Sequence, residues 1–192
     1  MRDIVARIDA LSDLINDLMI FARPRPPRLA VIELHTIIGD AITIVRRDPS
    51  AGGVEISLQG QPIAVPADGE LIRSMVLNLL LNAAQAMAGR GGRITVMTSQ
   101  QDERAVMTIR DTGPGVPQEI RDQIFEPFFT TKARGGGLGL PIARRTAELH
   151  GGSLALDCPG DGGTTVTIQL PLRARAATPD APLAAQAESA RT

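Results

Sequence analysis

The sequence has neither tryptophan nor tyrosine, and its 192 residues include a single cysteine, Cys158. One thiol cannot form an internal disulfide, and no Cys/His cluster has metal-ligand spacing, which suits a reducing compartment. We therefore interpret Cys158 as a small buried hydrophobe. No apolar run approaches the ~18 residues that span a bilayer, and the N-terminus lacks the charged-then-apolar plan of a signal peptide. We expect a soluble, cytoplasmic chain without membrane contact.

Neither sign of charge is in excess, because 20 basic side chains oppose 21 acidic ones and leave a net charge of -1. Such a balance provides no overall field for a nucleic acid or an anionic membrane, so we expect neither as a partner. Any phosphate binding must then be local. The length and the hydrophobic content of 43% predict one ordinary core, and therefore one compact domain with attachments.

The pattern of apolar residues divides the chain into three parts. Apolar residues recur every three or four positions over residues 4–21, which predicts an amphipathic helix that ends at the prolines of residues 23–28. Residues 29–172 mix strands and helices in an α+β order, and residues 173–192 have almost nothing large to bury, so we expect a disordered tail there. Within the central part we predict strands at 29–34, 54–58, 93–99, 105–110 and 164–170, and helices at 36–46, 68–87 and 140–150.

Two asparagines interrupt the apolar helix that is predicted at residues 68–87. Asn78 and Asn82 are four residues apart, so they share one face of that helix. Buried amides need partners, and this spacing lets both carbonyl oxygens converge on one hard cation such as Mg²⁺. Hydrogen bonds to a neighbouring loop are the alternative for these two side chains.

A carboxylate and two glycines follow the strand that is predicted at residues 105–110. Asp111, at the strand end, can accept a hydrogen bond from an exocyclic amino group, and Gly113 and Gly115 let the backbone approach a flat ring closely. An ordinary turn has the same composition, so this segment alone does not define a site.

A second glycine-rich segment, residues 135–140, precedes the last predicted helix. Unhindered backbone amides and the helix dipole favour phosphate oxygens at such a position, although a flexible loop is the alternative. Neither the GxxxxGK[ST] nor the GxGxxG pattern of other nucleotide sites occurs, so a nucleotide site here requires a different fold.

Three of the four phenylalanines, Phe125, Phe128 and Phe129, gather in the segment 124–132, which ends in a lysine. We interpret the phenylalanines as structural, because they can pin a mobile cover to the core. Lys132 is different, since its ammonium group can reach a terminal phosphate as a point charge.

These four segments resemble the N, G1, F and G2 boxes of sensor histidine kinases, in the same order, over roughly residues 68–152. The stretch Glu-Pro-Phe-Phe-Thr-Thr-Lys followed by Gly-Leu-Gly-Leu-Pro-Ile is similar to the nitrogen-regulation-type branch in particular. The resemblance implies the Bergerat, or GHKL, ATPase fold: a two-layer α/β sandwich with a mixed sheet covered by helices on one face. ATP would lie between the helices under a mobile lid of about residues 112–138.

The resemblance also implies roles for individual residues. Asn82 would be the principal Mg²⁺ ligand with Asn78 in support, and Asp111 would receive the adenine amino group. The remaining nucleotide contacts would come from Gly113, Gly115, Lys132, Gly135, Gly137, Leu138, Gly139 and Leu140. Related ATPases place a glutamate at the position of Asn78 as general base, and an amide cannot take that proton, so the site suits transfer to a protein side chain over hydrolysis.

The sequence departs from a complete kinase of this family in two ways. Gly136 stands where serine or threonine is more usual, and no first bundle helix with an acceptor histidine occurs. We interpret His35 and His150 as structural or solvent-facing. Residues 1–28 resemble the second bundle helix with its proline-rich exit, so we expect a truncated chain, or one half of a split kinase.

The partners follow from this interpretation. The acceptor histidine would belong to a dimerisation domain outside this chain, and the phosphoryl group would pass on to a cognate response regulator. The apolar stripe of residues 4–21 has lost its partner helix, and we hypothesise that it supports a homo-oligomer.

Two other functions share the nucleotide-binding motifs. One is a serine kinase that acts on an anti-anti-sigma protein, or a mitochondrial-type dehydrogenase kinase, against which the segment 126–132 and the bundle-like helix argue. The other is a nucleotide-binding regulatory module, or pseudokinase, without phosphoryl transfer. The presence of Asn82, Asp111 and Lys132 argues against a wholly degenerate site of that kind.

Overall fold

The structure is a computed structural model that describes residues 26–132, 136–159 and 162–173. The helix predicted at residues 4–21, the predicted tail after residue 173 and Gly135 lie outside these ranges. Within them, no helix combines the length and the apolar character needed to cross a bilayer.

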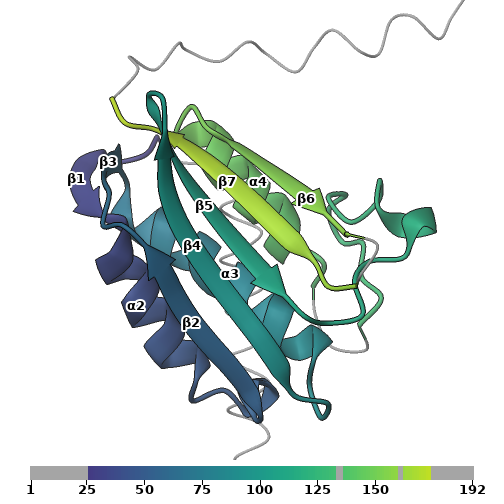
Figure 1. Cartoon of the computed structure of the whole chain (residues 1–192). Helices are drawn as coiled ribbons and strands as arrows, with labels where there is room; N and C mark the ends of the chain where they lie inside the picture. The colour runs from purple at the N-terminus through teal and green to yellow at the C-terminus, as the bar shows by residue number, and fades with distance from the viewer. Residues whose placement is uncertain (1–25, 133–135, 160–161, 174–192) are drawn as a thin grey trace, which may run out of the picture.

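A mixed five-stranded sheet forms one layer of the molecule (Figure 1). β2 (Val54–Gly60) runs parallel to β4 (Gly92–Gln101), and the other neighbours in the order β2-β4-β5-β7-β6 are antiparallel. The remaining strands of this sheet are β5 (Arg104–Asp111), β6 (Ser153–Asp157) and β7 (Thr165–Pro171). A separate two-stranded sheet pairs β1 (Ala30–Glu33) with β3 (Ala64–Ala67).

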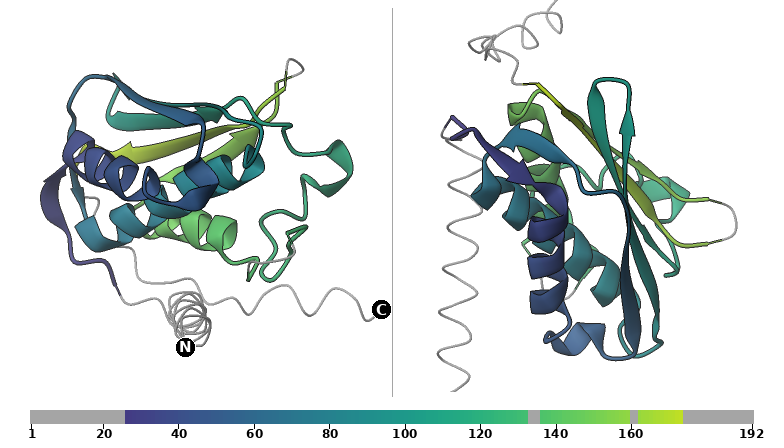
Figure 2. Two further views of the ribbon diagram at one scale, coloured as in Figure 1. Left: turned by 90° about the horizontal axis from the view of Figure 1, so that it is seen from below. Right: turned by 60° about the vertical axis from the view of Figure 1, so that its left-hand side comes forward.

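Three helices form the second layer, on one face of the sheet (Figure 2). They are α2 (Leu34–Val45), α3 (Gly69–Ala86) and α4 (Gly139–Leu149), and short 3₁₀ turns occur at η1 (Pro49–Ala51) and η2 (Gln118–Ile120). The predicted fold class, an α+β two-layer sandwich with helices on one face of a mixed sheet, is therefore confirmed. Each predicted central strand and helix is present, with ends within two residues of the prediction.

Two short strands are missing from the prediction. β3 contains Pro66, which lacks a backbone donor and argues against a strand, but it pairs with β1 at the margin of the fold. β6 is only five residues long and forms the edge of the large sheet beside β7. Pairing with another strand, β1 for β3 and β7 for β6, decides the conformation in both cases, and the local sequence does not.

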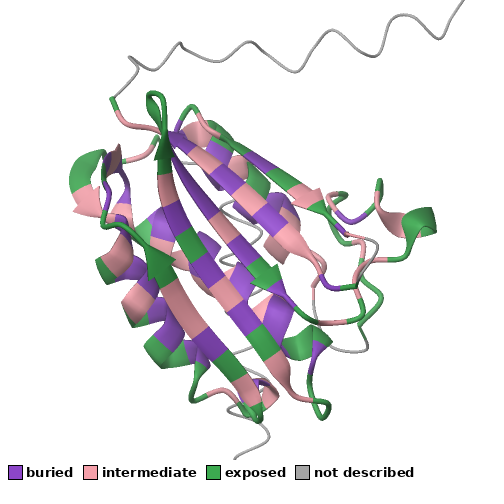
Figure 3. Ribbon diagram, viewed as in Figure 1, coloured by how far each residue is buried: buried purple, intermediate pink, exposed green. Residues whose placement is uncertain are grey.

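The sheet has a buried and an exposed face because its strands alternate apolar and polar residues. Along β4, Ile94 and Val96 are buried against the helices while Arg93 and Met97 are exposed (Figure 3). β7 repeats the pattern with buried residues at every second position. This alternation is typical of a sheet with one solvated face, so the helices must cover the other one.

One hydrogen-bond network ties the start of α3 to the end of α4. The side chain of Asp68 caps α3, because its Oδ1 accepts from the backbone N–H groups of Glu70 and Leu71. The backbone N–H of Asp68 donates to Nε2 of His150 at 2.9 Å, and Nδ1 of His150 lies 2.7 Å from the carbonyl oxygen of Thr146. His150 is buried and accepts through one ring nitrogen while it donates through the other, so its predicted structural role is confirmed.

His35 is also part of the framework. Its Nε2 lies 2.6 Å from Oγ1 of Thr98, a buried residue of β4 whose hydroxyl donates to the carbonyl oxygen of Gln61. Because that single hydroxyl proton is already used, Nε2 of His35 is the donor in this contact. His35 therefore links α2 to the sheet.

Loss of the acceptor on His150 should destabilise the domain. We expect His150→Ala to lower the free energy of unfolding by about 1–3 kcal/mol, because it leaves the buried Asp68 N–H without a partner. Urea unfolding followed by far-UV circular dichroism measures this change. Glu148→Ala, at an exposed position of the same helix, is the control and should stay within about 0.5 kcal/mol of wild type. Equal effects of the two variants would contradict the prediction.

Candidate functional site

Three of the predicted site residues, Asn78, Asn82 and Gly139, come together where α3 faces the start of α4. Asn78 and Asn82 are half-buried on α3. A Cβ atom on Gly139, the first residue of α4, would lie 3.4 Å from Nδ2 of Asn82 and 3.9 Å from the Cβ and Cγ atoms of Asn78. The backbone of α4 thus approaches both amides closely, and a glycine at this position leaves the approach free of a side chain.

Asn78 carries an unsatisfied polar group. Its Nδ2 is buried and has no hydrogen-bond partner among the described residues. A half-turn of the side chain would place Oδ1 at the same point, because the two ends of an amide have nearly the same shape. A buried amide without a partner costs about 1–3 kcal/mol, which indicates that a ligand completes this site.

The ammonium group of Lys132 contacts the second asparagine, Asn82. Nζ of Lys132 donates to Oδ1 of Asn82 at 2.6 Å and to Oε1 of Gln85 at 2.7 Å. Lys132 is exposed as a whole, yet the partial desolvation of its ammonium group lowers its pKa. The structure therefore brings Lys132 to Asn82, one of the two predicted metal ligands.

Gln85 belongs to this cluster and was not predicted. It lies three residues after Asn82 and seven after Asn78, so it occupies the same face of α3. This spacing is visible in the sequence alone, so it could have indicated that Gln85 lies beside the two asparagines. The contact with Lys132 depends on a loop 47 residues further along the chain, which the sequence does not place.

Asp111 ends β5 as predicted and is buried, with an exposed fraction of 6%. Its Oδ1 accepts from the backbone N–H of Gly113 at 2.8 Å and from that of Thr164 at 3.2 Å. Burial raises the pKa of the Asp111 carboxyl group, and the hydrogen bonds from Gly113 and Thr164 oppose this rise without cancelling it.

The glycines after Asp111 allow close backbone contacts. A Cβ atom on Gly113 would lie 2.8 Å from Oδ1 of Asp111 and 3.3 Å from Cγ of Met87, and one on Gly115 would lie 3.0 Å from the carbonyl oxygen of Gly163. Gly115 also has a φ angle of +75°, in the left-handed region. Packing of this loop therefore already requires both glycines, before any ligand is considered.

The phenylalanine segment lies against the second glycine segment. The backbone N–H of Phe128 donates to the carbonyl oxygen of Gly137 at 3.2 Å. A Cβ atom on Gly137 would come within 2.6 Å of the backbone of Phe128 and Phe129, so only glycine fits there. Phe125 packs against the core and under the guanidinium group of Arg144, at 3.9 Å from its ring centroid.

The anchoring role predicted for the three phenylalanines holds for Phe125 and is wrong for Phe128. Phe128 is 60% exposed and has a φ angle of 67°, because its backbone turns to meet Gly137. Leu138 is buried, with an exposed fraction of 2%, and Leu140 packs against the core. Leu138 therefore offers a ligand only its backbone groups, whereas the side chain of Leu140 is half-buried and remains partly accessible.

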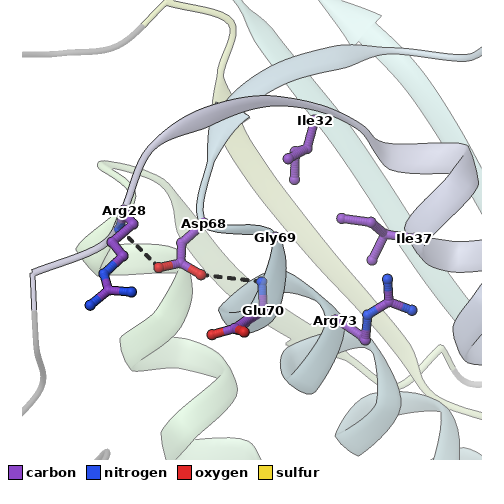
Figure 4. A pocket seen from close by; sticks show the side chains of 7 residues that line it. All are labelled: Arg28, Ile32, Ile37, Asp68, Gly69, Glu70 and Arg73. Atoms are coloured by element: carbon purple, nitrogen blue, oxygen red, sulfur yellow. Dashed lines mark hydrogen bonds between the residues drawn. The ribbon is translucent and has the colours of Figure 1, made fainter.

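A shallow cavity lies at the opposite end of α3 (Figure 4). Its volume is about 460 Å³, and it is lined by Arg28, Ile32, Ile37, Asp68, Gly69, Glu70 and Arg73. Gly69 precedes Asn78 by nine residues, which is about 13 Å along a helix. The cavity is therefore distinct from the cluster of Asn78, Asn82, Gln85 and Lys132, and the predicted site residues do not line it.

Comparison with known proteins identifies the family. Residues 67–174 match the family described as Histidine kinase-, DNA gyrase B-, and HSP90-like ATPase. The chain belongs to this family. The solved structure of a mycobacterial sensor histidine kinase, MprB, has a TM-score of 0.68 and 34% sequence identity over 77% of this chain and 99% of that one. Full-length ShkA in complex with AMPPNP has a TM-score of 0.76 and 28% identity over 88% of this chain and 37% of that one.

Curated relatives are similar over most of this chain. Sporulation kinase D of Bacillus subtilis (strain 168) is 31% identical over 170 residues, which cover 87% of this chain and 33% of the relative. The signal transduction histidine-protein kinase AtoS of Escherichia coli (strain K12) is 32% identical over 172 residues, with 88% and 28% covered. The chain thus spans about a third of the length of these relatives. It has the ATP-binding catalytic domain of sensor histidine kinases, which confirms the resemblance seen in the motifs.

The buried carboxylate should make stability depend on pH. Because the folded-state pKa of Asp111 lies above its ordinary value of 3.8, the unfolded chain loses this proton first as the pH rises. Wild type therefore loses stability relative to Asp111→Asn as the pH rises from 3.8 through the folded-state pKa, and the difference is constant above that window. We expect the Tm of Asp111→Asn minus that of wild type to increase with pH and then level off in melts from pH 3.5 to 7.5. A difference that decreases with pH would contradict the sign of the shift.

Proposed function

We propose that this domain binds Mg²⁺ and ATP at the cluster of Asn78, Asn82 and Lys132, and transfers the γ-phosphoryl group to a histidine of a dimerisation domain. The observation that carries this proposal is the cation-binding geometry at Asn82. Its Oδ1 already accepts a cationic ammonium group at 2.6 Å, beside the unsatisfied amide of Asn78. Two amide oxygens on one helical face suit a hard cation that retains water ligands.

The residues present fit a bound magnesium ion and a triphosphate. Asn82 would hold the metal directly and Asn78 would support it, while the metal when bound would neutralise charge on the phosphate oxygens. α4 contributes its first turn, because no side chain caps this helix. The backbone N–H groups of Gly139 and Leu140 are then free of a cap and can donate to phosphate oxygens, with the helix dipole in support.

In this proposal Asp111 binds the adenine base. Its carboxylate lies in a buried position at the end of β5. Water therefore competes little with an exocyclic amino group for a hydrogen bond to this carboxylate. Oδ1 is oriented by the N–H groups of Gly113 and Thr164, which fixes the carboxylate before a base arrives. Gly113 and Gly115 keep the neighbouring backbone free of side chains that would collide with a flat ring.

Transfer to a protein side chain is favoured over hydrolysis because the site offers no general base at Asn78. An amide cannot take a proton from water, so Asn78 positions a ligand and does not activate a nucleophile. Lys132, within reach of Asn82, would stabilise negative charge on the transferred group. Of the loop residues that would surround the phosphates, Gly137 lies against Phe128 and Gly139 lies against Asn82, and Gly135 lies outside the described residues.

The finer assignments rest on the sequence motifs. Residues 126–132 and 137–142 support a place in the nitrogen-regulation-type branch, with a cognate response regulator as final acceptor. The single cysteine suits a reducing compartment, which supports a cytoplasmic location. Residues 1–28 would be the second bundle helix with its linker, 29–172 the catalytic domain, and 173–192 a tail.

Calorimetric titration with ADP tests the site directly, since the lack of tryptophan and tyrosine rules out intrinsic fluorescence. We expect micromolar binding, on the order of -8 kcal/mol, which weakens when Mg²⁺ is removed. Asp111→Asn should also weaken the binding of ADP. The new NH₂ group would face the amino group of adenine, and two donors cannot form a hydrogen bond. The pH-dependent melts described above verify that this variant is folded. No heat at several temperatures, together with unchanged melting in ADP, would contradict the proposal.

The reaction itself is tested by adding a dimerisation domain that carries the acceptor histidine, together with ATP labelled on its γ-phosphate. We expect acid-labile label on histidine, and at least a hundredfold loss of rate in Asn82→Ala, because that variant lacks the metal-binding oxygen. Label on serine would favour a serine kinase. Binding of nucleotide without any transfer would favour a pseudokinase.

A further inference from the structure

Gln85 is the one member of the Lys132 contact that the family motifs do not explain. Its side chain is exposed near the C-terminal end of α3, yet its Oε1 accepts from Nζ of Lys132 at 2.7 Å. The same ammonium group donates to Oδ1 of Asn82 at 2.6 Å. Two neutral oxygens from successive turns of one helix therefore hold a cation from a distant loop.

The position of this ammonium group conflicts with the proposed metal site. Oδ1 of Asn82 is the atom that would hold Mg²⁺, and Nζ of Lys132 lies against it at hydrogen-bonding distance. Two cations cannot both lie on that oxygen, because at about 3–4 Å their repulsion in a partly buried site reaches several kcal/mol. Lys132 must leave Asn82 before a metal ion binds there.

We propose that Gln85 is a positioning residue that holds Lys132 on the metal-binding oxygen in the nucleotide-free state, so that Mg²⁺ and nucleotide bind by displacing this ammonium group. The inference rests on the proposed function, and it adds that the domain sets its own affinity through the contact between Gln85 and Lys132. Gln85 stabilises the free state more than the bound state. Its loss must then strengthen binding, which is the reverse of what loss of an ordinary ligand contact does.

The test is a double-mutant cycle on Mg²⁺·ADP binding, measured by calorimetry. We expect Gln85→Ala to lower the Kd for Mg²⁺·ADP about three- to tenfold, the range that corresponds to one hydrogen bond of typical net strength. In the Lys132→Met background the same substitution should change the Kd less than about 1.5-fold, because Gln85 acts only through Lys132. Gln59→Ala, which removes an exposed glutamine from β2, is the matched control and should leave the Kd unchanged.

A spectroscopic readout in the free protein completes the test. The side-chain amide signal of Asn82 should shift in both Gln85→Ala and Lys132→Met, since each alters the ammonium contact on its oxygen. Unchanged or weaker Mg²⁺·ADP binding in Gln85→Ala, or an effect that persists without Lys132, would overturn the proposal. If wild type binds no Mg²⁺·ADP, the proposed function fails, and titration with Mn²⁺ alone decides the inference. Broadening of the Asn82 signal must then be stronger in Gln85→Ala than in wild type, and equal broadening would refute it.

Discussion

The fold and the site both depend on the burial of one face of α3. Its residues Ile72, Met75, Val76 and Leu80 are fully buried between the sheet and the flanking helices. Each such side chain contributes about 1.5–3 kcal/mol on burial, so their sum exceeds the cost of about 1–3 kcal/mol for the unsatisfied amide of Asn78. Core packing thus fixes the rotation of α3, and that rotation keeps an unpaired polar group directed at the start of α4.

The two ends of α3 differ in how their polar groups are satisfied. At the first end, Asp68 caps the helix and His150 accepts its backbone N–H, so the ends of α3 and α4 are joined by directed hydrogen bonds. At the other end, Asn82 and Gln85 share a single lysine from the loop. Rigid support at one end and exchangeable partners at the other allow a ligand to replace those partners while the helices stay in place.

Asp111 shows how a proposed site residue can work against stability. Its carboxylate is buried at the end of β5, and burial raises its pKa although Gly113 and Thr164 donate to it. The glycines around it have contacts that no side chain would tolerate, as at Gly163, where a Cβ atom would lie 2.2 Å from the carbonyl oxygen of Asp111. A buried acceptor with fixed orientation is what recognition of a flat base requires, and a solvated aspartate would discriminate less.

The sequence by itself determined the main elements, because periodicity is a local property, and its motif order predicts Asn78, Asn82, Asp111 and Lys132 as site residues. It did not determine β3 and β6, whose conformation depends on pairing with β1 and β7. Only the tertiary structure decided that Lys132 lies on Asn82 and Gln85, and that Phe128 is exposed. The physical reason is that the contacts of Lys132 join segments separated by tens of residues, whose distance is fixed only by the packing of α3 against α4 and the sheet. The exposure of Phe128 follows from the turn at which its backbone meets Gly137.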